Sequence, residues 1–462
     1  MVQPGLTLIP ERGFGAVFSL ILVFLLSMAG CTMRSLNKDG GSGAGVPDDR
    51  YQAAVVWAWI HGSENMSAPP FLSTADPSGA GGIGGFGSPA LTIDLNLVAD
   101  ASPTLGLVLI HCDRNWKPTE SVFIQDRTRL RSTDFIVETA PIGVLNYDYS
   151  ATITFPSETN TIDVEHSGNY IARIINYYDG ETVLAELRFF AVESTAGVRL
   201  EMISDFYESA WTDKVQEGLR ARTEITPGPT SFSTQFQAVH LYEQGKWLYP
   251  MVADENSRSR TPAKGEYRAT WSPFYGRKVV ADFFNIPSGN EHRILDLTDM
   301  VEYPSNGGVL TTRLSDQPRY ASYSEQDNNG LVLFPYVSPE DNDLVYFEFR
   351  LDLDGEEIYD DMAVVGSFNN WTPSYDWRLV YNSITGQYAA RGWVKRAMHE
   401  YEYVNGRWNV DSGILEQAEA TLLEGNNVYA SQTWYALAYY RDQTALSYDR
   451  IVGVGTDISG GR

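Results

Sequence analysis

The chain of 462 residues has only two cysteines, Cys31 and Cys112, and only six histidines. No cysteine pair stands at the close spacing that zinc sites use, and the histidines form neither an H-x-H nor an H-E-x-x-H pattern. The sequence also lacks a G-x-S-x-G motif, and none of its many carboxylates stands in a recognisable acid/base motif. We therefore expect no bound metal, no cofactor and no catalytic residues, and we predict that the protein is not an enzyme.

Positive charge is also scarce. The chain has 34 Lys and Arg residues against 59 Asp and Glu residues, which gives a formal net charge of −25. Such a charge repels phosphate backbones, so it argues against nucleic acid as a partner. An acidic surface suits solubility, and it is also typical of proteins from salt-loving hosts. The sequence leaves both interpretations open.

The composition predicts short strands joined by turns. The sequence contains 27 Tyr, 11 Trp, 40 Gly and 22 Pro residues, which favours strands and turns over long helices. The length exceeds what one hydrophobic core usually organises. We predict an all-β protein of several immunoglobulin-like sandwiches.

The first thirty residues have the pattern of a signal peptide. An apolar run over 13–30 is short for a membrane span, and it ends at Cys31 in the sequence SMAGC. This stretch resembles a bacterial lipobox, although Met28 stands where Leu is more usual. The resemblance implies a signal peptide over 1–30 and a lipidated Cys31 that begins a flexible tether over 31–50. The alternative is an ordinary signal peptide with a chance cysteine.

Three β domains are expected after the tether. Strand-like runs bounded by turns predict an immunoglobulin-like sandwich over 51–195 and a second β domain over 196–337. A polar linker then leads to a third β domain over 338–462. A glycine-rich stretch over 77–89 leads into a strand rather than a helix, so we interpret it as a surface loop and not a phosphate cradle.

One local grouping could suggest nucleophilic chemistry. His111, Cys112 and Asp113 are consecutive and place a thiol between a base and a carboxylate. On an extended strand, however, neighbouring side chains point to opposite faces, so the histidine cannot activate the adjacent thiol. We expect a structural role for both.

The third block resembles the glycogen-binding-type carbohydrate modules of starch-branching enzymes. The resemblance rests on MAVVGSFNNWTP at 362–373, on the stretch that leads to YEYVNGRW at 401–408, and on NNVY at 426–429. It implies that Trp393, Trp408 and Asn427 stand where relatives stack on and hydrogen-bond a sugar, and that Trp371 belongs to the scaffold. Glu402 stands near the position of the sugar-binding lysine, which is a reversal of charge.

A longer resemblance extends from about residue 51 to the C-terminus. Five segments follow one another in the order of the plug protein family of the Bacteroidota type IX secretion system: LVLIHCDRNWKPTES (107–121), SGNYIARI (167–174), SGNEHRILDL (288–297), VVGSFNNW (364–371) and YDRIVGVG (448–455). None is specific alone, but five in order are hard to obtain by chance.

This resemblance implies a non-catalytic subunit on the periplasmic face of the outer membrane, held there by the lipid anchor. Its partner would be the large outer-membrane barrel translocon, whose periplasmic mouth it closes. We expect the translocon contact in the glycine-rich loop around Ile83 and Phe86 or in aromatic loops of the last domain. The alternative function is a glycan-binding outer-membrane lipoprotein that uses Trp393 and Trp408.

Overall fold

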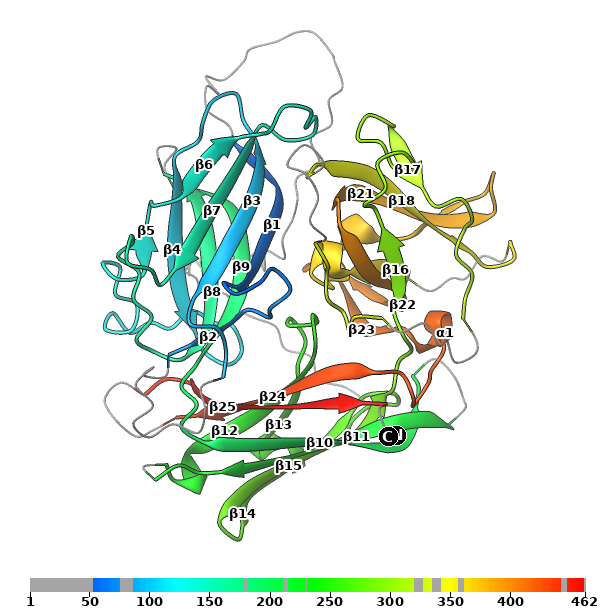
Figure 1. Cartoon of the computed structure of the whole chain (residues 1–462). Helices are drawn as coiled ribbons and strands as arrows, with labels where there is room; N and C mark the ends of the chain where they lie inside the picture. The colour runs from blue at the N-terminus through cyan, green and yellow to red at the C-terminus, as the bar shows by residue number, and fades with distance from the viewer. Residues whose placement is uncertain are drawn as a thin grey trace, which may run out of the picture.

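The computed structural model describes residues 53–74, 86–177, 181–210, 215–229, 231–258, 260–319, 327–334, 342–355, 361–441 and 447–460. Six sheets pack as three sandwiches (Figure 1). The only α-helix among these residues is α1 (Thr421–Glu424). No helix in the described part of the chain is long and apolar enough to cross a membrane. The prediction of an all-β, multi-domain sandwich protein is confirmed.

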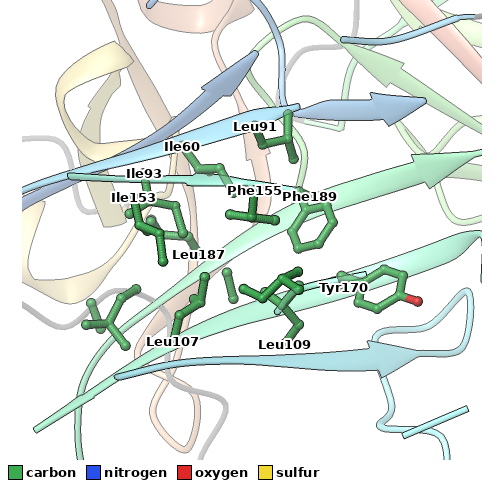
Figure 2. Close-up of a cluster of buried hydrophobic side chains, with 14 of the residues drawn as sticks. Ile60, Leu91, Ile93, Leu107, Leu109, Ile153, Phe155, Tyr170, Leu187 and Phe189 are labelled. Carbon is green, nitrogen blue, oxygen red and sulfur yellow. The ribbon is translucent and has the colours of Figure 1, made fainter. Parts of the chain in front are cut away.

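The first sandwich is built from the first nine strands of the described chain. One sheet has the order β1-β3-β7-β6 and the other β2-β9-β8-β4-β5. The strands are β1 (Ala54–Gly62), β2 (Phe71–Ser73), β3 (Leu91–Val98), β4 (Leu105–Cys112), β5 (Arg131–Ser132), β6 (Ile136–Thr139), β7 (Tyr149–Phe155), β8 (Gly168–Asn176) and β9 (Thr182–Val192). Alternate residues of facing strands, such as Ile93, Leu109 and Phe189, fill the core between the sheets (Figure 2).

The middle sandwich is built from two separate parts of the chain. Its sheets have the orders β10-β11-β15-β14 and β13-β12-β24-β25. The strands are β10 (Gly197–Glu208), β11 (Val215–Thr226), β12 (Phe236–Glu243), β13 (Met251–Asp254), β14 (Arg268–Tyr275), β15 (Lys278–Pro287), β24 (Gln432–Tyr440) and β25 (Arg450–Ser459). The last strands of the chain therefore lie beside strands from its middle, as the red and green ribbons of Figure 1 show.

The third sandwich interrupts the middle one. Its sheets have the orders β16-β22-β19, with β23 beside β22, and β17-β18-β21-β20. The strands are β16 (Arg293–Asp296), β17 (Val309–Thr311), β18 (Leu344–Asp352), β19 (Asp361–Gly366), β20 (Val380–Asn382), β21 (Gln387–Lys395), β22 (Met398–Asn409) and β23 (Ile414–Glu419).

The expected boundaries of the second and third domains are therefore wrong. The prediction assigned 338–462 to one domain, but β24 pairs with β12 and completes the middle sandwich. Conversely, β16 was expected in the second domain and pairs with β22 of the third. The physical reason is burial: alternate residues of β24 face two different cores, as Ala436 and Leu437 do, so both faces need a partner.

Candidate functional site

The predicted sugar-binding residues do not come together. Trp393 lies on β21 and alternates with Val394, which faces the core, so its ring lies on the outer face of that sheet and is 36% exposed. Trp408 lies on β22 and packs with Val404 and Leu415 on the outer face of the opposite sheet. The two indoles thus stand on opposite sides of one sandwich. They cannot form a common platform for a sugar chain.

Asn427 also does not act together with either tryptophan, because its hydrogen bonds position the backbone. Its side-chain Oδ1 accepts the backbone N–H of Tyr429 at 3.0 Å, and its own N–H donates to the carbonyl of Gly289 at 2.6 Å. These bonds fix the segment that connects α1 to β24. Trp371 is 4% exposed, as expected for a scaffold residue, and its Nε1 donates to the carbonyl of Gly330.

Of the two loop residues expected to contact the translocon, the structure describes only Phe86. Ile83 and Cys31 lie outside the described residues. Phe86 is half-buried: its ring lies 5.2 Å from Phe71 and 6.3 Å from Tyr435, and its N–H donates to Ser194 Oγ. The structure therefore places Phe86 where the first and middle sandwiches meet. The expectation that this residue contacts the translocon stays a prediction, and the aromatic cluster leaves only part of its ring accessible.

A polar network joins the first sandwich to the middle one. The Glu193 carboxylate accepts Ser167 Oγ at 2.7 Å and Arg450 Nε at 2.8 Å. Asp449 is 2% exposed and accepts the backbone N–H of Arg114 at 3.1 Å. Charge-assisted bonds of this kind are strong when water is excluded. Three of the five resemblance segments, 107–121, 167–174 and 448–455, meet at this joint.

His111 and Cys112 are structural parts of the same region. His111 Nδ1 lies 2.8 Å from Thr119 Oγ1 and Nε2 lies 3.1 Å from the Ser167 carbonyl. Burial lowers the pKa of His111 to about 4, and it raises the pKa of the Cys112 thiol, with a contribution from Asp113, to about 12. A neutral buried thiol is a poor nucleophile.

A second joint links the first sandwich to the third. Lys395 is 2% exposed, and its Nζ donates to Asn96 Oδ1 at 2.6 Å and to the carbonyl of Asn342 at 2.8 Å. The same ammonium lies 5.2 Å from the ring centre of Trp57 and 4.9 Å from that of Tyr147. Burial lowers the pKa of Lys395 to about 7, although nearby carboxylates oppose the change. The joint is thus built around a single enclosed amine.

A third joint, between the middle and third sandwiches, contains the densest group of ionisable residues. His292 precedes β16, Glu400 lies on β22, and Asp327 lies in a turn, and all three are buried. His292 Nδ1 lies 2.8 Å from Asp327 Oδ2 and 3.3 Å from Glu400 Oε2. Burial alone would lower the pKa of His292, but the two carboxylates outweigh it and raise the pKa to about 10.

The surroundings of this group are also charged. Lys246 Nζ lies 2.8 Å from both Glu243 Oε1 and Glu402 Oε1. It also lies 5.2 Å from the ring centre of Trp371. Glu243 lies 3.8 Å from His292 Nε2. Glu402, which reversed the charge expected in a sugar site, therefore pairs with a lysine of the neighbouring sandwich.

The largely enclosed cavity where all three sandwiches meet is small. It has a volume of about 100 Å³, and its lining includes Trp59 and Arg188 of the first sandwich, Trp247 of the middle one and Trp371 of the third. This volume holds about three water molecules, whereas small-molecule pockets usually measure about 300 Å³ or more. The cavity therefore does not fit a sugar ring or a nucleotide.

Sequence reasoning missed the His292, Asp327 and Glu400 group. Its members come from three distant segments, so no local spacing could reveal it. The only signal was indirect: His292 lies inside SGNEHRILDL, one of the resemblance segments.

Comparison with known proteins supports the fold. No family model and no curated protein matches the chain. It is similar to the crystal structure of a hypothetical protein from Parabacteroides merdae, with a TM-score of 0.65 and 15% sequence identity. The match covers 88% of this chain and 97% of that one. At this identity the likeness shows the fold alone, and it extends over nearly the whole of both chains.

Proposed function

We propose that the protein is the non-catalytic plug subunit of a type IX secretion translocon. It closes the periplasmic mouth of the outer-membrane barrel and is held at the membrane by a lipid on Cys31. The observation that carries the proposal is the position of the five resemblance segments. Each contributes residues to a joint between sandwiches, such as Ser167 and Asp449 at one joint and His292 and Trp371 at another.

The joints suit this function physically. A body that covers a wide pore must resist bending, and stacked sandwiches joined by buried polar and aromatic contacts do so without any reactive group. The chain connectivity adds to this stiffness, because the third sandwich is inserted between β15 and β24 and is therefore linked to the middle one by two chain connections. Glycan binding, the alternative, is less well supported because Trp393 and Trp408 lie on opposite faces.

Purification of the tagged chain in mild detergent tests the proposal directly. We expect the very large barrel protein to copurify with it, and we expect cells without the protein to become sensitive to large antibiotics. The Cys31→Ala variant should leave the membrane fraction, whereas Cys112→Ala, the matched control, should stay there. Recovery of no barrel partner, together with an intact permeability barrier in the deletion strain, would refute the proposal.

A further inference from the structure

The joint between the middle and third sandwiches has the geometry of a metal site. His292 Nδ1, Asp327 Oδ2 and Glu400 Oε2 all lie within 4.8 Å of one another, with the nitrogen 2.8 Å and 3.3 Å from the two oxygens. Ligand atoms bound at about 2.0–2.1 Å to one tetrahedral cation stand about 3.3–3.4 Å apart. The Nδ1–Oε2 distance of 3.3 Å matches this spacing, whereas the Nδ1–Oδ2 distance of 2.8 Å is shorter.

A second observation points to a ligand. His292 Nδ1 is buried between the two carboxylates, 2.8 Å from Asp327 Oδ2 and 3.3 Å from Glu400 Oε2, in the place where a cation would replace its proton. The buried Oδ1 of Asn329, two residues after Asp327, has no partner within the described part of the chain. Buried polar atoms are rarely left without partners. A cation at this place would supply a partner for the Asn329 oxygen.

The hydrogen bonds to the two carboxylates match the outer shell of metal centres, whereas the carboxylate nearest to the second ring nitrogen of His292 lies beyond hydrogen-bond length. Metal-binding histidines usually direct their second ring nitrogen toward a carboxylate, and metal-binding carboxylates accept further hydrogen bonds. Here Glu243 lies 3.8 Å from His292 Nε2. Glu400 Oε2 accepts the N–H of Gly330 at 2.6 Å, and Asp327 Oδ2 accepts the N–H of His292 at 2.6 Å.

Charge favours a cation as well. The Asp327, Glu400, Glu243 and Glu402 carboxylates surround the site, and the described cationic groups that face them are Lys246 and the His292 ring. Glu291, whose Oε2 accepts the N–H of Asp327 at 3.4 Å, adds a further acidic group. Excess buried negative charge is costly unless it is paired or coordinates a metal.

We propose that His292, Asp327 and Glu400 bind one divalent transition-metal ion, which holds together the part of the third sandwich that faces the middle one. One imidazole and two carboxylates suit Zn²⁺ and its neighbours better than Ca²⁺. On binding, the ion takes the place of the proton on Nδ1, and that proton passes to solvent. The ion ties β16 and β22 to the turn at Asp327, so its role is structural.

Zn²⁺ is the probe for the test. The full chain is treated with a chelator, incubated with Zn²⁺, dialysed and analysed for metal content. We expect about one equivalent of zinc per chain and a higher Tm than in the chelator-treated sample. Asp327→Asn and Glu400→Gln should each lose at least ten-fold in zinc affinity. His61→Gln is the matched control, because His61 is a buried histidine 2.9 Å from one carboxylate, Asp94, and it should retain the metal.

A second measurement does not depend on the folding of the variants. Co²⁺ added to the chelator-treated wild-type chain should give visible ligand-field bands without a thiolate charge-transfer band, because the site contains no cysteine. Zinc retention below one tenth of an equivalent and no Co²⁺ spectrum would overturn the proposal. Equal retention by Asp327→Asn and His61→Gln would also overturn it, since the metal would then lie elsewhere.

Discussion

The aromatic joint around Phe190 should control the stability of the first and middle sandwiches together. Phe190 lies on β9 and is fully buried, with its ring 5.2 Å from Phe71, 5.3 Å from Trp116 and 5.4 Å from Tyr242. Phe71 and Trp116 belong to the first sandwich, and Tyr242 lies on β12 of the middle one. Phe190→Ala removes this shared contact.

The expected loss follows from the burial. Truncation of a fully buried phenylalanine costs about 3–5 kcal/mol of the free energy of unfolding, and the loss of several ring pairs places this site in the upper part of that range. With an m value in urea of about 3 kcal/mol/M or more, the midpoint should fall by roughly 1 M. Phe206→Ala on β10, where the ring is 71% exposed, should stay within about 0.5 kcal/mol of wild type.

Urea unfolding followed by tryptophan fluorescence and by far-UV circular dichroism measures both effects. If the joint couples the sandwiches, the two signals of the wild-type chain coincide and shift together in Phe190→Ala. An unchanged midpoint in Phe190→Ala would refute the reasoning. So would a wild-type chain whose sandwiches unfold in separate transitions, because the joint would then transmit no stability.

Two further predictions concern buried ionisable groups. Burial lowers the pKa of Lys395 in the folded chain to about 7. Between pH 7 and about 10.4, Lys395 is therefore protonated in the unfolded chain and neutral in the folded chain. The free energy of unfolding should therefore rise with pH across this window, by about 4 kcal/mol from pH 7 to 10, relative to Lys395→Met. If urea unfolding shows the same pH dependence of this free energy in the wild type and in Lys395→Met, the prediction is contradicted. Cys112, with its pKa raised by burial to about 12, should react with a disulfide reagent at pH 8 only at the rate of unfolding in a chain that lacks Cys31. Immediate reaction in native buffer would contradict its enclosed position.

The local structure was largely predictable from the sequence, because strands and turns have local signals. The alternation in LTIDLNLV predicts β3, whose Ile93 and Leu95 face the core. The turn at Gly245 has a φ of 81°, which explains the glycine, since a Cβ there would also lie 2.6 Å from Trp371 Nε1.

Long-range pairing was not predictable in this way. The run TWYALAYY predicts a strand buried on both faces, but nothing in the run indicates that this strand pairs with β12. The same limit applies to the ionisable group at the third joint, because His292, Asp327 and Glu400 meet only after β16 crosses into the third sandwich. Residue types could be listed from the sequence, whereas their convergence depends on the insertion of the third sandwich into the middle one.

The discontinuous middle sandwich also sets the order in which the protein can mature. A chain that is synthesised from its N-terminus delivers β12 long before β24 and β25, which must close the same sheet. Until then β12 has an open edge, and such edges pair readily with other chains. Because distant pairings form slowly, the newly made protein has a vulnerable interval in which chaperones would have the most effect, and loss of only the final two strands would leave a product that aggregates.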